Sequence, residues 1–427
     1  MTMLTTFVLG LLMQQPSPDS LYLNYCYSKA RANYPFAEVI ELQHQITELS
    51  TRIAHTAYYP RVEVNGRASY QSEVTEFGIP GAGSPPAVSK DQYEASLNIR
   101  QNIYSGGTVG IRKKLEQMKG RQAVQSAQVE LHKIRSQIDQ LYFGILLSKR
   151  QAENVQLVGE SVRERLGNVR VKVENGVLLP SQQRILEAEL IKVSQDSADI
   201  QSNIRAGYSM LSQIIGETIE TGTPLILPQI PQKLERFNAR RPEMEVFDTQ
   251  RNVLGHQKEL AATKKRPNIS AFAKASYGRP GLNFLNDDFH DYYMIGLNVK
   301  WDFLNFLNAD DEQQRIRIQQ QQVDEHKRAF SVQLDVALNN IQERIYAIKE
   351  NIKRDKEIIA LRDKIVKESA SQLENGAITA TEYLTELNRF NQARLSLSTN
   401  KLKLVQTQIE YLTTLGADTD EASFSYK

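Results

Sequence analysis

The chain has 427 residues, with 52 basic and 50 acidic side chains, a formal net charge of +2 and a mean hydropathy of −0.45. A charge so nearly balanced excludes the strongly basic field of a nucleic-acid-binding protein, so we expect no nucleic-acid partner. No apolar stretch reaches the ~18–20 residues that a membrane-spanning helix requires. Any contact with a bilayer must therefore use β-strands.

Residues 1–18 have the features of a short signal-like segment. Phe7–Leu12 is apolar and suits the hydrophobic region of a secretory signal peptide, although no basic residue precedes it and no clear cleavage motif follows. An atypical signal peptide and a cloning remnant or fraying terminus both agree with this pattern. The single cysteine, Cys26, has no partner for an internal disulfide, and we interpret it as a residue on the face of a helix.

The chain repeats itself over about half its length. Leu97–Arg100 returns as Leu297–Lys300, and Asn175-Gly176 returns as Asn375-Gly376, each 200 positions later. We expect an internal two-fold repeat with one copy at 19–216 and the other at 241–416. A connector at 217–240, rich in Pro, Thr and Gly at its start, joins the copies, and a tail follows at 417–427.

Each copy contains two runs in which apolar and polar residues alternate strictly, which predicts β-hairpins at 61–103 and 268–303. The runs are about ten residues long, whereas strands of globular proteins have about 5–6. Long strands with one apolar face, one charged face and aromatic residues near their ends are typical of transmembrane β-structure. The charged face, expected to line a barrel lumen, carries Arg61, Arg67, Arg100, Lys274 and Lys300. The aromatic residues expected to face lipid are Tyr59, Tyr70, Tyr293, Trp301 and Phe303.

A long helical pattern follows each hairpin. Apolar residues recur every seven positions from Val124 to Ile145 and from Leu338 to Leu373, which predicts coiled-coil packing. No proline interrupts 107–179 or 301–373, so each helix can extend for about 100 Å. Shorter return helices, 181–216 and 381–416, are expected to pack antiparallel to the long ones. Amphipathic segments at about 21–57 and 242–264 precede the hairpins.

The sequence shows no pattern of catalytic residues. Its six histidines are scattered without metal-ligand spacing, and no nucleophile stands beside a candidate base. We therefore expect no enzyme, and no catalytic, metal or cofactor site.

The number of strands implies an assembly. Four strands are too few to close a barrel, for which about eight is the practical minimum, and open strand edges are not tolerated in lipid. Three chains would supply twelve strands, so we expect a homotrimer. The fold class predicted is mainly α with transmembrane β: a trimeric 12-stranded barrel continued by a long antiparallel α-helical coiled-coil barrel, which together form a conduit.

This arrangement resembles the TolC family of outer-membrane efflux proteins over about residues 19–416. The resemblance rests on Tyr58-Tyr59-Pro60 before the first strand, on the pattern L-N-[IV]-[RK] in each hairpin, and on two similar helical turns, Glu174–Ser181 and Glu374–Thr381. It implies a channel in the outer membrane of a Gram-negative bacterium that extends into the periplasm. It also implies a periplasmic adaptor and an inner-membrane pump as partners, in tripartite efflux or type I secretion.

The resemblance also implies roles for residues at the two helical turns. In the family a glycine is followed five residues later by Ser or Thr, as here at Gly176/Ser181 and Gly376/Thr381. An acidic residue that follows lines the closed aperture; here Glu382 matches it and Gln182 does not, and Glu386 lies one turn on, beside Thr385. The residues expected to dock the adaptor are Asn175, Gly176, Val177, Leu178, Ser181, Asn375, Gly376, Ala377, Ile378 and Thr381, and those expected at the aperture are Gln182, Glu382 and Glu386.

A second interpretation is a soluble or periplasmic coiled-coil scaffold or adaptor. In that case the alternating runs would be surface hairpins with one buried face.

Overall fold

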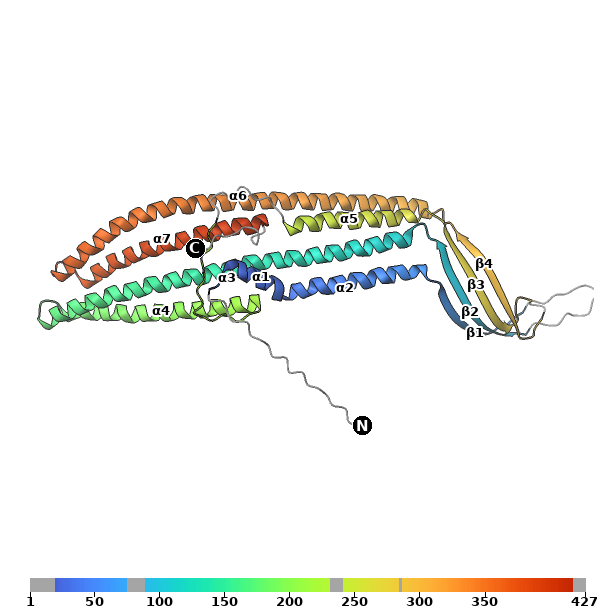
Figure 1. Ribbon diagram of the computed structural model, residues 1–427, viewed down its shortest axis with the longest axis horizontal. Helices are drawn as coiled ribbons and strands as arrows, with labels where there is room; N and C mark the ends of the chain where they lie inside the picture. Colours follow the sequence, from blue (N-terminus) through green and yellow to red (C-terminus); the bar gives the residue numbers. More distant parts are fainter. Residues whose placement is uncertain (1–19, 75–88, 231–240, 284–285, 418–427) are drawn as a thin grey trace, which may run out of the picture. The chain divides into compact units, whose positions relative to one another are not determined.

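The structure, a computed structural model, describes residues 20–74, 89–230, 241–283 and 286–417. The signal-like segment 1–18, the second part of the connector and nearly all of the tail lie outside these residues. The helices (Figure 1) are α1 (Leu23–Asn33), α2 (Pro35–His55), α3 (Thr108–Glu174), α4 (Pro180–Ile215), α5 (Pro242–Thr263), α6 (Asn305–Glu374) and α7 (Ala380–Leu415). A 3-10 turn, η1 (Thr56–Tyr58), follows α2. No described helix is long and apolar enough to cross a membrane.

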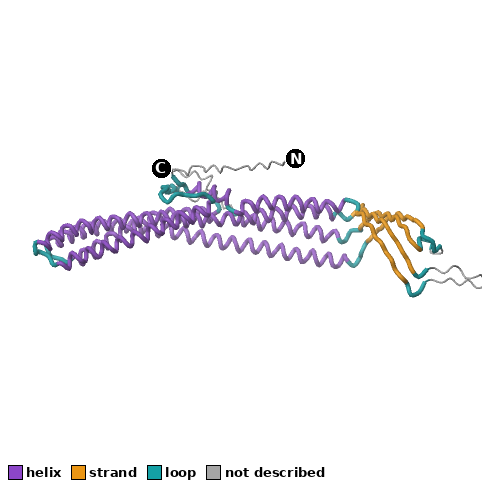
Figure 2. Tube along the Cα trace, turned by 90° about the horizontal axis from the view of Figure 1, so that it is seen from below, coloured by secondary structure: helices purple, strands orange, loops and turns teal. Residues whose placement is uncertain are grey.

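Within the described residues, four strands form one antiparallel sheet in the order β1-β2-β3-β4 (Figure 1). Figure 2 shows these strands in orange. They are β1 (Arg61–Tyr70), β2 (Asp91–Tyr104), β3 (Asn268–Arg279) and β4 (His290–Lys300). The alternating run at the end of the second predicted hairpin extends to Phe303, but the strand ends at Lys300. The ring nitrogen of Trp301 donates to the Lys265 carbonyl at 3.1 Å, and the Asp302 carboxylate accepts from the Leu304 backbone N–H at 3.1 Å. These hydrogen bonds lie where the chain leaves the sheet after Lys300.

The register of the sheet sorts the side chains onto two faces. Arg61 lies opposite Arg100 and Arg67 opposite Glu94, while Val64 lies opposite Leu97. The pairings of β2 with β3 and β3 with β4 continue the same alternation, so that Lys274 and Lys300 share the face of Arg61. One face is therefore mainly polar and the other mainly apolar, as the alternation predicts.

Burial on this sheet is the reverse of that in a soluble protein. On the polar face Ser96, Ser270 and Ser276 are buried, and Glu94 forms an ion pair with Lys274 and accepts hydrogen bonds from Ser276 and Tyr292. On the apolar face, side chains are widely exposed: Val64 80%, Tyr293 75%, Ile295 75% and Leu297 69%. A one-layer antiparallel sheet in water normally covers its apolar face and leaves the polar one wet. The apolar face of this sheet requires another apolar environment.

Aromatic side chains gather at both ends of the sheet. Near the turns between paired strands, Phe289 stacks on Tyr93 and Tyr277 with ring centroids 6.1 and 5.8 Å apart. At the end that leads into the helices, Trp301 lies 4.9 Å from Phe303 between ring centroids. Tyr59 and Tyr70 are 59% and 76% exposed. Aromatic groups thus flank the exposed apolar face on both sides.

The chain divides into two compact units, each built from both halves of the sequence. The first comprises 1–38, 127–242 and 330–427, and the second comprises 39–126 and 243–329. The second unit contains the sheet, and the first contains both turns between a long helix and its return helix. Helices α3 and α6, with 67 and 70 residues, are each continuous, because the prolines that would break them are absent.

The first unit is organised around α1. Its side chains Leu23, Cys26 and Tyr27 are buried against residues of α3, α4 and α7. The predicted segment 21–57 is not one helix but two, because Pro35 disfavours helical backbone at Tyr34, which is extended (φ −72°, ψ 140°). Burial raises the pKa of the Cys26 thiol to about 12, so the sulfur is a core group rather than a reactive one.

One carboxyl group is enclosed in this core. Asp139 of α3 is 6% exposed; one of its oxygens accepts a hydrogen bond from the Tyr27 hydroxyl, and the other accepts from the Thr413 hydroxyl at 3.2 Å. Burial raises the pKa of Asp139 from 3.8 to about 7, although the two hydrogen bonds and the charge of Arg135 oppose that rise. Asp139 therefore changes its charge near neutral pH.

We predict that stability falls as the pH rises from 4 to 7. An unfolded Asp139 ionises near 3.8 but the folded one only near 7. The contribution of this group to stability is therefore fully present below 3.8, falls by about 4 kcal/mol as the pH rises to 7, and is constant above that pH. Unfolding of the detergent-solubilised protein at a series of pH values measures the slope of the unfolding free energy against pH. The Asp139→Asn variant should lack this part of the slope, and parallel pH profiles of the two proteins would disprove the assignment.

Candidate functional site at the helical tips

The two turns that join a long helix to its return helix, which we call tip 1 (174–181) and tip 2 (374–381), have the same backbone conformation. Gly176 and Gly376 are left-handed, with φ of 73° and 71°. The N–H of the next residue, Val177 or Ala377, donates to a carbonyl five residues earlier at 2.8 Å in both. This is the Schellman geometry in which glycine ends a helix, and it sets the angle at which α4 and α7 return.

The return helices begin differently. In tip 1, α4 starts at Pro180 after Leu179, which makes no side-chain cap. In tip 2, the Thr379 hydroxyl accepts from the Glu382 N–H at 3.3 Å, and the Glu382 carboxylate accepts from the Thr379 N–H at 2.7 Å. This reciprocal pair is a capping box. Hydrogen bonds from the Thr379 backbone and hydroxyl lower the pKa of Glu382, so the residue predicted for the aperture also holds the end of its own helix.

The two tips are held against each other within the first unit. The Gln182 side-chain oxygen accepts from the Ala380 N–H at 2.5 Å, so tip 1 satisfies a backbone donor at the start of α7. The Glu374 carboxylate pairs with Arg165 of α3, and Lys172 donates to the Glu374 carbonyl. Polar contacts therefore join the end of α6 to the last turns of α3.

An apolar cluster lies beneath these polar contacts. Leu178 and Ile378, both predicted for docking, pack on its edge. The Arg165 guanidinium lies 5.7 Å from the Tyr383 ring centroid. The buried members come from all four helices of the tips: Val162, Val169, Leu186, Ala370, Leu373, Ala380, Tyr383, Leu384 and Leu387. The tips thus form one small core rather than two independent hairpins.

The structure places the other predicted tip residues at the surface. Val177 is 66% exposed, and Leu179 beside it is 68% exposed. Glu386, predicted for the aperture, is half-buried and bridges Arg362 of α6 at 2.9 Å and Arg389 at 2.6 Å. The remaining docking residues are exposed: Asn175, Gly176, Ser181, Asn375, Gly376, Ala377 and Thr381. The tips therefore offer a solvent-facing rim around a shared core.

Sequence reasoning missed several residues of this site. Thr379 is recognisable from the motif T-x-x-E at the start of a helix, and the sequence contains that signal at Thr379–Glu382. Arg165 and Glu374 lie 209 positions apart, and no local pattern indicates that they meet. Among the described residues, no group of three or more His, Cys, Asp or Glu side chains is arranged to hold a metal ion.

Known structures share this fold. The chain aligns with the outer membrane protein VceC of Vibrio cholerae at 14% identity and a TM-score of 0.70, covering 92% of this chain and 96% of that one. It aligns with the transmembrane channel protein CusC at 14% identity and a TM-score of 0.73, covering 96% of each chain. It aligns with the CmeC outer membrane channel of Campylobacter jejuni at 11% identity and a TM-score of 0.67, covering 94% of this chain and 88% of that one. The chain therefore has the fold of these outer-membrane channels, as the resemblance to the TolC family predicted.

Sequence comparisons identify no relative of this chain. No protein-family model matches the chain, and no curated protein matches it significantly. At identities this low, the likeness to the solved channels concerns the fold.

The capping box supplies a direct test of the geometry at tip 2. Replacing Thr379 by Ala removes the acceptor for the Glu382 N–H, and we expect the free energy of unfolding to fall by about 1 kcal/mol. Thr381→Ala is the matched control, because Thr381 is exposed in the first turn of the same helix. Denaturant titration of both variants measures the difference, and equal losses would show that the box contributes nothing specific.

Proposed function

We propose that this chain is one protomer of an outer-membrane exit duct. The duct passes small molecules or proteins from a periplasm-spanning pump to the exterior, in a tripartite efflux or type I secretion system. The observation that carries the proposal is the exposed apolar face of the sheet, on which Val64, Ile295 and Leu297 have no cover among the described residues. On the opposite face, Glu94 instead bonds to Lys274 and Ser276. In a membrane barrel lipid covers such an apolar face and the polar face lines a wet lumen.

The unpaired edges of the sheet support a homotrimer. Among the residues that the structure describes, β1 and β4 each pair on one side only, and backbone groups at an open edge have no partner in hydrocarbon. Three copies would close a twelve-stranded ring, since four strands per chain fall short of the approximately eight that a barrel needs. The long helices would then leave the barrel together and continue the passage through the periplasm.

The solvent-facing rim of the tips supports docking of a periplasmic adaptor, which would link the duct to an inner-membrane pump. Val177 offers an exposed apolar contact next to the left-handed Gly176. Gln182, Glu382 and Glu386 would lie at the aperture, where each now makes contacts within the chain. Opening would exchange polar contacts such as Arg362–Glu386, each of small net energy near water, while the apolar cluster moves as a packed unit.

A pair of neighbouring residues tests the membrane assignment. Leu297 and Asn298 point to opposite faces of β4. We expect Leu297→Arg to abolish stable outer-membrane insertion, because an arginine on the lipid face costs about 2–4 kcal/mol in each protomer. Asn298→Arg, on the polar face, should leave a detergent-dependent trimer.

Membrane fractionation followed by mass measurement in detergent distinguishes the outcomes. A wild-type chain that stays monomeric and soluble without detergent would instead support the coiled-coil scaffold. Equal insertion of both arginine variants would remove the assignment of the apolar face to lipid.

The tip geometry supplies a second test. Proline cannot adopt the φ of 71° found at Gly376 and lacks the N–H that donates to the Leu373 carbonyl at 3.1 Å. We expect Gly376→Pro to reduce export to the level of cells without the protein while trimers still reach the membrane. Gly167→Ala, in an open position inside α3, is the control. Full export by the Gly376→Pro variant would contradict a role for the tips.

A further inference from the structure

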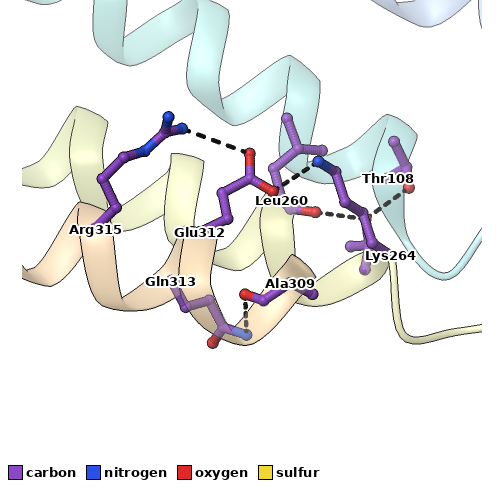
Figure 3. A network of polar contacts seen from close by, with 8 residues as sticks. Thr108, Leu260, Lys264, Ala309, Glu312, Gln313 and Arg315 are labelled. Carbon is purple, nitrogen blue, oxygen red and sulfur yellow. Dashed lines mark hydrogen bonds and ion pairs between the residues drawn. The ribbon is translucent and has the colours of Figure 1, made fainter. Parts of the chain in front are cut away.

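A hollow of about 670 Å³ lies in the second unit, where the strands join the helices. It is lined by the helix-side ends of all four strands, by the last turns of α5 and by the first turns of α3 and α6. Figure 3 shows part of its wall: Lys264, just after the end of α5, faces Glu312 of α6, and Thr108 at the start of α3 lies nearby. We call it the junction hollow.

The junction hollow has an excess of positive charge. Its lining contains two carboxylates, Asp302 and Glu312, and six cationic side chains, Arg61, Arg112, Lys264, Arg266, Lys300 and Arg315. The excess is therefore four positive charges per chain. The helices α3 and α6 also begin here, and the amino ends of helices carry partial positive charge.

The carboxylates near the hollow already have partners. Glu312 accepts from Lys264 at 2.6 Å and lies 4.0 Å from Arg315 (Figure 3), and Asp302 accepts from the Leu304 N–H. Farther along the polar face, Glu94 forms an ion pair with Lys274 and accepts hydrogen bonds from Ser276 and Tyr292. The remaining acid of that face is Glu63, opposite Asn98 on the neighbouring strand. These acids reduce the positive field but leave a net excess.

Four cations of the hollow make no ion pair with any described residue: Arg61, Arg112, Arg266 and Lys300. Arg266 donates to the Gly106 carbonyl at 2.6 Å, which leaves the side chains of Arg61, Arg112 and Lys300 with neither an ion pair nor a hydrogen bond to a described residue. The sheet register also sets Arg61 directly opposite Arg100. Like charges in that position repel and destabilise a strand pair unless an anion lies between them. The arrangement therefore favours an anion from outside the chain.

We propose that the junction hollow is a specificity-determining site of the duct that favours anionic solutes over cationic ones. The inference rests on the proposed function, in which the polar face of the sheet lines the lumen and three copies of the hollow surround it. Positive side chains at a narrow aqueous passage raise the local concentration of anions and lower that of cations. Arg61 and Lys300 are the determinants on the strands, and Arg112 is the determinant on α3.

Ion selectivity of the purified protein in planar bilayers tests this proposal. Under a potassium chloride gradient near 0.1 M, we expect chloride to be about threefold more permeant than potassium, and the preference to shrink near 1 M salt, where the screening length falls to about 3 Å. The double variant Arg61→Gln/Lys300→Gln should lower the permeability ratio to about one. The charge-preserving variant Arg61→Lys/Lys300→Arg should retain the wild-type ratio.

The outcomes separate this inference from the duct itself. Channels that are cation-selective, or a double variant with the wild-type ratio, would overturn the role of the junction hollow and leave the duct intact. A wild-type protein that forms no channel would overturn the proposed function and this inference together. The salt dependence is measured on the wild type, so the test does not depend on the folding of a variant.

Discussion

Backbone hydrogen bonding at the edges of the sheet is the constraint on which the rest of the structure depends. Each strand must pair on both sides if it is to lie in hydrocarbon, yet within the described parts of the chain β1 and β4 pair on one side only. The exposed apolar face excludes water as a stable environment for the sheet, and the open edges exclude a single copy in lipid. The ring of chain copies that we propose would meet both requirements and would bring the long helices together.

The tips combine a cohesive core with exchangeable contacts. The apolar cluster around Leu186, Leu373 and Leu384 excludes water and holds four helix ends together. The contacts above it, such as Arg165–Glu374 and Arg362–Glu386, are partly exposed ion pairs, whose net energies are small because water competes for both partners. A structure of this kind changes its polar contacts at low cost without losing its packing.

Charged groups are used differently in the two units. In the first, Asp139 is enclosed among Tyr27 and Thr413, so burial controls its protonation and links the packing of α1, α3 and α7 to pH. In the second, cations such as Arg61 and Lys300 are exposed, and the proposed role of the junction hollow is to act through them on ions from solution. A chain with a net charge of only +2 thus has a strongly positive region because its charges are unevenly placed.

The sequence alone determined the long helices, most of the extent of the strands and the faces of the sheet, but it missed the break at Tyr34 and the end of the last strand at Lys300. Alternation with a period of two assigns Leu297 and Asn298 to opposite faces, and glycines at 176, 216, 376 and 416 end the helices with left-handed backbone. These features depend on neighbours a few residues away, so local pattern reveals them. It also placed Gly176, Gly376 and the residues around them in the turns between long helices, although their functional roles remain predictions.

Only the tertiary structure decided which distant groups meet. Gln182 caps Ala380, Arg165 pairs with Glu374, and Asp139 is enclosed by Tyr27 and Thr413. The junction hollow likewise gathers Arg61, Arg112 and Lys300 from three separate elements. Residues so far apart in the chain leave no periodic signal, because their proximity depends on how whole helices and strands pack rather than on any spacing in the sequence.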